Sequence, residues 1–304
     1  MLTKKIVKII KNPKKIIIFL ASKGIIPYND EKYLKYVYKE KTGDDLNLDN
    51  PKNFTEKLQW LKLFDRNPLY TKLVDKYEVR DYVKNLIGEE YLIPCLGVYD
   101  NVNEIDFEQL PNQFVLKTTH DSGTVVICKN KKNFDISKSK KFLSKRLKRK
   151  YFYLWREWPY KDVKPRIIAE KYMEDKTYKG INDYKFYCFN GEPKIMFIIS
   201  ERNIKPKISF YDMDFNKLDM HQTFPDYNKK IEKPKNFEKM IQFCKILGKN
   251  FPHVRIDFYE CNDQLYFGEL TFFDSAGFDK FSPDVYNDIL GEWIDLERVN
   301  KYNH

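Results

Sequence analysis

Two acidic residues in the last third of the chain lie where a β-hairpin would bring them together. Asp257 belongs to the run VRIDF at 254–258, and Glu269 belongs to the run LYFGELT at 265–271. If the turn between these strands centres on Asp263, Asp257 pairs directly with Glu269, about 5 Å away on the same face. A register shifted by one residue would put the two carboxylates on opposite faces of the sheet.

Such a pair of carboxylates suits a hard divalent cation. Two acids this close repel each other unless a cation lies between them, and Mg²⁺ prefers oxygen ligands, with phosphate oxygens completing its shell. Arg255 and Thr271 share the face of the pair, and Arg255 would meet a terminal phosphate. The alternative is an exposed cluster of Arg, Asp and Glu. The apolar flanks, Phe267 included, favour a partly buried metal site, because unpaired buried acids are costly.

A second candidate site for phosphate lies earlier in the chain. Lys117 ends a predicted strand, and the loop that follows it contains His120, Ser122 and Gly123. The exposed N–H groups of such a turn, next to a lysine, can cradle a phosphate. The loop is not a Walker A motif, so from these residues alone an ordinary polar hairpin turn is the better explanation.

Three further segments are candidates for ligand binding. Lys185, within the run DYKFY at 183–187, is either a second phosphate ligand or a solvent-facing strand residue. Glu170 opens the segment 170–173, which follows a buried strand and could present backbone groups to an adenine edge or simply leave the sheet. The stretch 151–160 interleaves Tyr and Trp with charged residues, a composition that suits stacking of a sugar or nucleobase as well as packing in a core.

The hydrophobic periodicity predicts the elements that must position these residues. Apolar residues at helical spacing predict helices over much of 30–90, including one helical segment at 70–86, and at 137–150 and 237–250. Strands are predicted at 114–118, 124–128, 167–169, 183–189, 192–199, 254–259 and 265–271. Asn190-Gly191 is a strong signal for a two-residue hairpin turn. The order predicts an α+β fold, mostly helical over 1–110 and rich in antiparallel hairpins over 111–304.

The composition is that of a globular protein with a basic surface. Its 304 residues are 42% hydrophobic and 33% charged, and the formal net charge is +11. Only nine of the 55 basic residues are arginine, the type that forms phosphate forks. We therefore expect nucleotides, acidic glycans or anionic lipid as partners, and no nucleic acid. Five scattered cysteines without a CxxC pair argue against disulfides or a zinc site and for a cytoplasmic compartment.

The N-terminal segment is basic and partly apolar. Its uninterrupted apolar run, residues 16–21, is too short for a signal-peptide core or a membrane span. Three interpretations remain: a basic helix interrupted at Pro13 and packed on its own domain, a peripheral contact with the anionic inner membrane face, or a docking helix for a partner.

In order and spacing, these motifs resemble the ATP-grasp superfamily. Its features are Lys117 before a small-residue loop, the segment 170–173, Arg255 two residues before Asp257, and Glu269 downstream. More narrowly, the chain resembles the TupA-like branch of teichuronopeptide biosynthesis. That resemblance spans residues 57–271 and rests on the blocks KLQWL (57–61), DKYEVR (75–80), FVLK (114–117), EWPY (157–160), DYKFY (183–187) and YFGELT (266–271).

The resemblance implies an ATP-grasp fold, in which two α+β subdomains, about 111–173 and 174–304, grip ATP and Mg²⁺ between them. The residues implied to bind ATP are Lys117, His120, Ser122, Gly123, Glu170, Lys171, Met173, Lys185 and Arg255, of which Lys185 and Arg255 are also the implied catalytic residues. The implied metal ligands are Asp257, Glu269 and Thr271. Thr271 stands where many superfamily members have asparagine, and its hydroxyl is a weaker ligand.

The activity implied by the resemblance is that of a carboxylate–amine ligase acting through an acyl phosphate, in capsule or cell-wall polysaccharide synthesis. The acid would be a uronic acid on a glycan or glycan precursor, and the acceptor an amine or amino acid. Alternatives are a sugar phosphotransferase with the same ATP site, a glycosyltransferase and a glycan-binding module. Asp212-Met213-Asp214 fits the DxD motif of glycosyltransferases, although its composition also predicts an Asp-rich turn.

Overall fold

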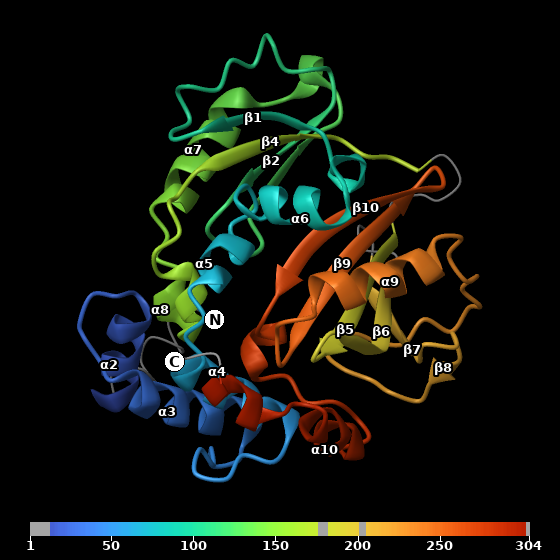
Figure 1. Ribbon diagram of the computed structural model, residues 1–304. Helices are drawn as coiled ribbons and strands as arrows, with labels where there is room; N and C mark the ends of the chain where they lie inside the picture. Colours follow the sequence, from blue (N-terminus) through green and yellow to red (C-terminus); the bar gives the residue numbers. More distant parts are fainter. Residues whose placement is uncertain (1–12, 176–181, 201–204, 302–304) are drawn as a thin grey trace.

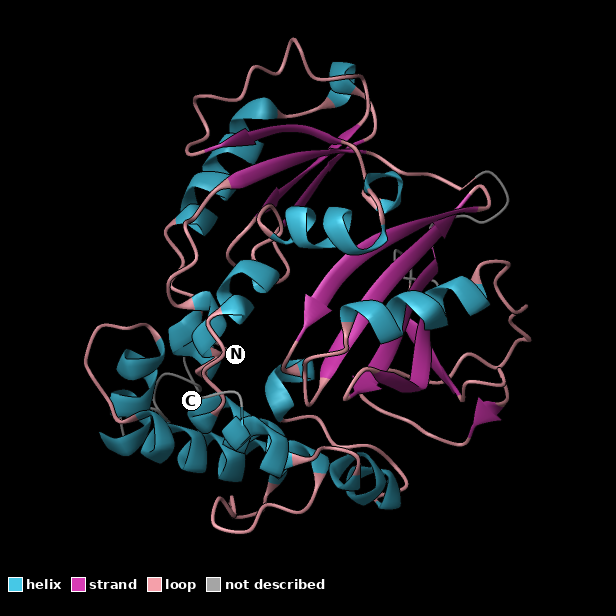
Figure 2. Cartoon of the chain, viewed as in Figure 1, coloured by secondary structure: helices cyan, strands magenta, loops and turns pink. Residues whose placement is uncertain are grey.

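The computed structural model describes residues 13–175, 182–200 and 205–301. N-terminal helices and two antiparallel sheets make up the molecule, which confirms the predicted α+β class (Figure 1, Figure 2). Of the basic N-terminal segment, residues 1–12 lie outside the described ranges, and a helix begins at Pro13. Within the described ranges, no helix has the length and apolarity needed to span a bilayer.

Helices occupy most of the described chain before the first strand, as the periodicity predicted. Side chains cap the starts of two of them: Asn29 accepts a hydrogen bond from a backbone N–H of its helix, and Asn53 forms a reciprocal capping box with Glu56. The first two helices pack together over a core that includes Ala276 and Phe278. The elements are α2 (Pro13–Ser22), α3 (Asp30–Thr42), α4 (Phe54–Phe64), α5 (Leu69–Val74), α6 (Val79–Ile87) and the 3-10 turn η1 (Glu89–Tyr91).

The helical segment predicted at 70–86 is two helices, α5 and α6, interrupted at Asp75. The prediction was wrong here because Asp75 caps a turn: its Oδ1 accepts a hydrogen bond from the N–H of Tyr77 at 2.8 Å. The interruption also places Lys76 where its Nζ donates a hydrogen bond to the carbonyl of Asp121.

A four-stranded antiparallel sheet forms the upper part of the molecule in Figure 1, with the strand order β1-β4-β2-β3. Its strands are β1 (Cys95–Tyr99), β2 (Phe114–Thr118), β3 (Val125–Cys128) and β4 (Ile167–Lys171). The predicted hairpin of β2 and β3 is confirmed, with Lys117 opposite Val125. The sequence patterns did not predict β1, which pairs with β4. Helix α7 (Ile136–Leu147) packs on this sheet and buries Leu143 in its core.

A six-stranded antiparallel sheet has the order β10-β9-β5-β6-β7-β8. Its strands are β5 (Asn182–Phe189), β6 (Glu192–Ser200), β7 (Lys207–Tyr211), β8 (Lys217–Leu218), β9 (Val254–Cys261) and β10 (Gln264–Thr271). The predicted turn between β5 and β6 is confirmed, with φ of 52° at Asn190 and 87° at Gly191. Helix α9 (Phe237–Leu247) packs on the sheet through Phe237, Met240 and Cys244.

Short elements complete the described chain. They are η2 (Lys131–Asn133), α8 (Phe152–Trp155), η3 (Trp158–Tyr160), η4 (Asp274–Gly277), α10 (Val285–Glu292) and η5 (Leu296–Lys301).

All five cysteines are free thiols, which agrees with their scattered spacing in the sequence.

The Asp212-Met213-Asp214 motif lies in the turn between β7 and β8. The Asp212 carboxylate accepts hydrogen bonds from the N–H groups of Asp214, at 3.0 Å, and Asn216, at 2.7 Å. It thus caps its own turn, as the predicted Asp-rich turn requires. The motif therefore gives the glycosyltransferase interpretation no support.

The last hairpin reaches its pairing through a β-bulge. β9 and β10 are joined by a two-residue turn at 262–263, and continuation of that register would put Glu269 opposite Ile256, on the face away from Asp257. Gly268 is an extra residue on β10, and it shifts the register so that Glu269 lies opposite Asp257. The predicted carboxylate pair is confirmed, for a reason that the alternation pattern did not contain.

Glycine suits the bulge because the two strands approach closely there. A Cβ atom on Gly268 would lie 3.0 Å from the carbonyl oxygen of Asp257 and 3.0 Å from the ring of Tyr259. A larger residue would therefore make these neighbours shift by a few tenths of an ångström at the position of the carboxylate pair. Gly268 avoids that shift.

Candidate active site

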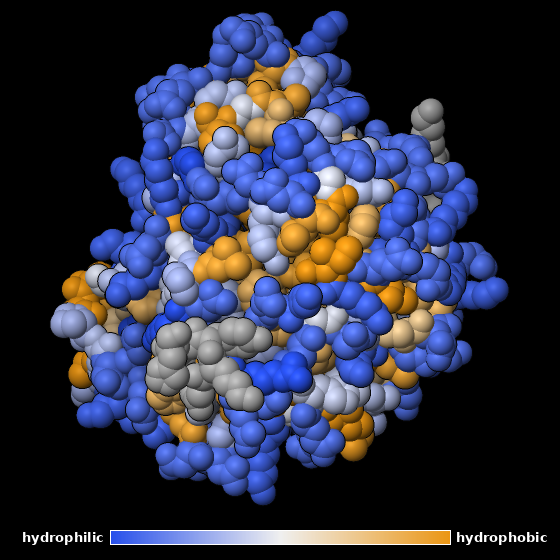
Figure 3. All heavy atoms as spheres, viewed as in Figure 1, coloured by the Kyte–Doolittle hydropathy of each residue, from blue (hydrophilic) through white to orange (hydrophobic). Residues whose placement is uncertain are grey.

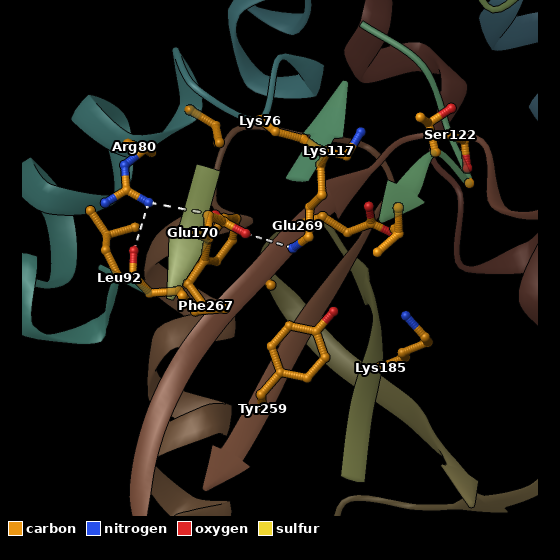
Figure 4. Close-up of a pocket in the computed structure, with 16 residues that line it drawn as sticks. Lys76, Arg80, Leu92, Lys117, Ser122, Glu170, Lys185, Tyr259, Phe267 and Glu269 are labelled. Atoms are coloured by element: carbon orange, nitrogen blue, oxygen red, sulfur yellow. Dashed lines mark hydrogen bonds and ion pairs between the residues drawn. The ribbon is translucent and has the colours of Figure 1, made fainter. Parts of the chain in front are cut away.

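A pocket of about 160 Å³ lies between the two sheets, and side chains converge on it from both sheets and from α6 (Figure 4). Part of its lining is apolar and comes from Val79, Leu92, Ile93, Tyr259 and Phe267. The other part is polar or charged and includes Lys76, Arg80, Lys117, Ser122, Glu170, Lys185 and Glu269. Apolar surface also gathers in the middle of the face drawn in Figure 3, over the region of α6 and β10. A planar base would match the apolar part of the pocket lining, and a polyanionic tail would match the charged part.

Cationic side chains surround a carboxylate on the small-sheet side. Lys117 of β2 forms an ion pair with Glu170 of β4, with 2.7 Å between Nζ and Oε2. Arg80 of α6 lies 3.8 Å from the other oxygen of Glu170 and donates a hydrogen bond to the carbonyl of Ile93 at 3.0 Å. Burial lowers the pKa of Lys76, and the nearby carboxylate of Glu269 acts in the opposite direction. An anion entering this region would find cations already positioned.

Lys185 supplies the cation on the large-sheet side. It is buried in β5, where its Nζ lies 3.0 Å from Asp183 and forms a second, short ion pair with Asp257. β5 pairs with β9 so that Lys185 lies directly opposite Asp257. Its place in the middle of a central strand therefore brings it to the carboxylates of the last hairpin and not to solvent.

The loop after β2 is fixed by a buried acid. Asp121 is fully buried, and its Oδ2 accepts a hydrogen bond from the Thr124 hydroxyl at 2.7 Å. Ser122 and Gly123 then line the pocket, and nothing lies within 4 Å of where a Cβ atom of Gly123 would be. His120 is buried and does not line the pocket.

Asp257 and Glu269 lie side by side, bridged by the guanidinium of Arg255. Its Nη2 is 2.8 Å from Asp257 Oδ2 and 2.8 Å from Glu269 Oε1. It also donates to the Thr271 hydroxyl at 3.0 Å, and that hydroxyl lies 3.3 Å from Glu269. Nε faces Asp257, and Nη1 forms an ion pair with Asp274. The structure thus brings the predicted metal ligands and Arg255 together, with all three guanidinium nitrogens facing carboxylates.

The surroundings of these groups shift their pKa values in different directions. Burial raises the pKa of Asp257 to about 6, although Arg255 and Lys185 lower it. Burial also acts to raise the pKa of Glu269, but the same two cations outweigh it and lower that pKa to about 2. Burial would lower the pKa of Arg255, but Asp257 and Asp274 outweigh burial and raise it well above its usual value. Arg255 is therefore charged at any physiological pH.

The donor set fits a divalent cation shared with phosphate. The ion pairs of the cluster join four carboxylates, those of Asp183, Asp257, Glu269 and Asp274, to the two cations Lys185 and Arg255. Within these ion pairs the carboxylates outnumber the cations by two, and Lys76 near Glu269 leaves an excess of one negative charge. Carboxylate oxygens are the ligands that Mg²⁺ prefers. The described residues include no group of three or more His, Cys, Asp or Glu that could hold a metal ion. Phosphate oxygens would therefore have to complete the shell.

Some predicted residues lie outside this pocket. Lys171 is exposed at the end of β4, where its N–H donates to the carbonyl of Pro94 at 3.0 Å. Met173 is half-buried beyond it, and neither residue lines the pocket. Arg255 and Thr271 line a neighbouring pocket, and Asp257 is fully buried behind them and lines neither pocket.

Two cationic pocket residues had no predicted role. Lys76 and Arg80 both line the pocket, one at the interruption after α5 and the other in α6. The signal that could have found them is the run of charged residues in the block DKYEVR at 75–80. The helical periodicity carried no information on which lysine would face a ligand.

The chain matches a protein family and is similar to several solved structures. The model of the family described as "TupA-like ATPgrasp" matches residues 56–295. Among solved structures, the chain is similar to D-alanine–D-alanine ligase from Bacillus anthracis, with 12% identity over 83% of this chain and 72% of that chain and a TM-score of 0.41. The corresponding ligase from Helicobacter pylori has 13% identity over 82% and 68%, with a TM-score of 0.41.

A third solved structure is that of the ATP-grasp ligase PsnB with Mg and ADP. It shares 10% identity over 82% of this chain and 66% of that chain, with a TM-score of 0.40. Among curated proteins, none matches. The family match covers most of the chain, including both sheets and every residue that lines the pocket. The chain therefore belongs to the TupA-like ATP-grasp family and has an α+β ATP-grasp fold.

Proposed function

We propose that the protein is an ATP- and Mg²⁺-dependent ligase that joins a carboxylate to an amine through an acyl phosphate. The observation that carries the proposal is the location of charge: Lys185, Asp257 and Glu269 cluster together, and Glu269 lines both the nucleotide pocket and its neighbour. Charge neutralisation there would act on the terminal phosphate, where the bond between the β- and γ-phosphates breaks. An adenylating enzyme would instead need charge neutralisation at the α-phosphate.

In the proposed reaction, a carboxylate oxygen of the acid attacks the γ-phosphorus, and the bond to the β-phosphate oxygen breaks to release ADP. The amine nitrogen then attacks the carbonyl carbon of the acyl phosphate, and phosphate leaves with the electron pair of the broken C–O bond. The chain's part is mainly to hold these groups in position and to neutralise charge.

The roles we propose for the residues follow their positions. Lys117 and Lys185 would bind phosphate oxygens by charge-assisted hydrogen bonds, beside the backbone of Ser122 and Gly123. Asp257 and Glu269 would hold Mg²⁺, which would neutralise the phosphates. Arg255 would reach the γ-phosphate only by exchanging one of its present carboxylate partners.

The adenine would lie against the apolar part of the pocket. Leu92, Ile93 and Phe267 belong to that part, and Glu170 is at the adjoining end of β4. Lys171 and Met173 continue from it, so their backbone groups remain our proposed contacts to the adenine edge.

We place the reaction in capsule or cell-wall polysaccharide synthesis. The resemblance to the teichuronopeptide branch supports a uronic acid on a glycan or glycan precursor as the acid, and an amino acid or amine as the acceptor. The net charge of +11 suits an acidic glycan.

The products of ATP cleavage test the reaction type. With Mg²⁺, ATP and glucuronate or a glucuronate-containing oligosaccharide, we expect ADP and phosphate, and we expect added hydroxylamine to trap a hydroxamate. We expect these products because the charged residues of the site would lie around the terminal phosphate of a bound ATP. Chromatography of the nucleotides and a colorimetric hydroxamate assay measure both. AMP with pyrophosphate would refute the acyl-phosphate route, and a phosphorylated sugar would favour the phosphotransferase.

A cytoplasmic location at the inner membrane face is part of the same proposal. α2 carries lysines beside Ile17 and Phe19, which are 41% and 50% exposed, and Ile25 just beyond it is 65% exposed. We expect the protein to sediment with vesicles of phosphatidylglycerol at low salt, and substitution of Phe19 by Ser to reduce the bound fraction several-fold. Equal sedimentation with neutral vesicles, or none with anionic ones, would rule out this contact.

A further inference from the structure

A second pocket, of about 320 Å³, adjoins the nucleotide pocket. Ser122 and Glu269 line both, so the two pockets meet at Glu269, one of the proposed metal ligands. Aromatic residues, among them Tyr151, Trp155 and Tyr160, contribute to its wall. A small molecule in this pocket would lie next to the terminal phosphate of a nucleotide in the first.

Glu157 is the buried acid of this second pocket. Its side chain lines the pocket and is only 4% exposed, and the Tyr151 hydroxyl lies 3.4 Å from its Oε1. Asp257, which is also buried, has two cationic partners, whereas Glu157 forms no ion pair within the described part of the chain. Burial raises the pKa of Glu157 to about 7, with Lys62 acting in the opposite direction. Because a buried carboxylate without an ion-pair partner in direct contact is costly, this position is suited to a cation that arrives with a ligand.

The backbone before Glu157 is held in an unusual conformation. Arg156, which follows α8, has φ of 57°, a region that non-glycine residues rarely adopt. Its guanidinium packs over the ring of Tyr33, 3.9 Å from the centroid, and pairs with Asp30 at 2.7 Å. The N-terminal helices thus hold Arg156, while the neighbouring Glu157 lines the pocket.

A second strained segment contributes to the same lining. Ser275 and Ala276, in η4, have φ of 48° and 52°. Two buried side chains of α4 fix them: Gln59 donates to the carbonyl of Gly277 at 2.6 Å, and Lys62 donates to the carbonyl of Ala276 at 2.6 Å. Strain of this kind persists only where the surroundings impose it, and it concentrates at ligand-binding and active sites.

We propose that the second pocket binds the amine acceptor of the ligase and that Glu157 binds the acceptor's ammonium group and takes up its proton. This inference rests on the proposed function and assigns its acceptor side. One proton passes from the ammonium group to the Glu157 carboxylate, and the freed lone pair attacks the acyl carbon. As the C–N bond forms and the C–O bond to phosphate breaks, the second proton leaves with the phosphate.

The lining also indicates the class of acceptor. Lys41 is exposed and lies over the Trp155 ring, with its Nζ 5.1 Å from the centroid, so a cation stands at the pocket as well as an acid. An ammonium group at Glu157 and a carboxylate at Lys41 would match an amino acid. The aromatic wall would contact the acceptor's carbon atoms.

Binding to single variants tests the assignment. Wild type and Glu157→Gln are loaded with Mg²⁺ and a non-hydrolysable ATP analogue, and the common amino acids, glucosamine and glucuronate are titrated separately by calorimetry. We expect at least one amino acid to bind wild type and to bind Glu157→Gln about tenfold or more weakly, because a charge-assisted bond is lost. Glu157→Asp, which keeps the charge, should recover part of the affinity. The nucleotide affinity of both variants should equal that of wild type, which shows that they are folded.

A matched control is Glu260→Gln. Glu260 accepts a hydrogen bond from Asn236 at 2.6 Å and lines neither pocket, so this variant should bind the amino acid as wild type does. Equal amino-acid affinity in wild type and Glu157→Gln, binding of glucuronate alone, or no amino acid that binds wild type would overturn the inference. Hydroxamate formation distinguishes failure of this inference from failure of the proposed function. If hydroxamate still forms but the amino-acid binding results are not obtained, only the assignment of the acceptor site is wrong.

Discussion

Replacing Glu269 with glutamine should lower Mg²⁺-dependent ATP turnover by at least about 100-fold, because the neutral amide no longer holds the cation that neutralises the phosphates. Arg255, the buried partner of Glu269, keeps its ion pairs with Asp257 and Asp274, so the change leaves no buried charge unpaired. The melting temperature should therefore change little. ADP release across a Mg²⁺ titration, together with a melting curve, measures both effects.

Asp257→Asn should show the same loss of turnover together with a loss of stability. Asp257 is fully buried, and its ion pairs with Arg255 and Lys185 would both be weakened. Breaking a buried ion pair from one side costs on the order of 3–5 kcal/mol of unfolding free energy. Denaturant unfolding of the variant would report this difference from Glu269→Gln.

Asp274→Asn separates the metal role from the packing role. Asp274 is buried, pairs with Arg255 and accepts a hydrogen bond from the Tyr187 hydroxyl at 2.6 Å, and it is not one of the proposed metal ligands. This variant should lose stability while the Mg²⁺ concentration for half-maximal turnover stays that of wild type. Wild-type turnover in Glu269→Gln, or an equal shift of the Mg²⁺ dependence in Asp274→Asn, would contradict the metal assignment.

Lys117→Met should weaken ATP binding by about 10- to 100-fold, since it removes a charge-assisted contact to phosphate. The side chain of Lys117 is 22% exposed, and its partner Glu170 keeps Arg80 at 3.8 Å, so stability should fall little. Lys185→Met should weaken binding similarly but also destabilise the fold, because Asp183 and Asp257 would lose a buried cation. Calorimetric titration of ATP and thermal melting give the two quantities.

The matched control for the lysines is Lys164→Met. Lys164 forms a surface ion pair with Asp100 at 2.8 Å, and both side chains are more than half exposed. An exposed pair contributes little to stability, so both ATP affinity and melting temperature should be unchanged. If Lys117→Met and Lys185→Met also bind ATP normally, the loop after β2 is an ordinary hairpin turn.

Local signals account for the parts of the fold that the sequence predicted. The hairpins at 114–128 and 183–199 are joined by short turns whose residues favour them, and alternation defines the strands on either side. β1 has no such signal: Pro94 precedes it, Gly97 lies within it, and its partner β4 is about 70 residues away. The interruption between α5 and α6 was missed because a single side chain, that of Asp75, competes with the helix.

The residue types that could do chemistry are visible in the sequence: two carboxylates and an arginine that alternate onto one face, and lysines on two other strands. Their meeting in one cluster depends on how the strands pair in the folded chain. The bulge at Gly268 sets the register that pairs Asp257 with Glu269, and the pairing of β5 with β9 brings Lys185 to them. The second pocket depends still more on folding, because its lining comes from five distant parts of the chain, between residues 41 and 279. Alternation and periodicity act over neighbouring residues, whereas register and pockets depend on packing between segments far apart in sequence.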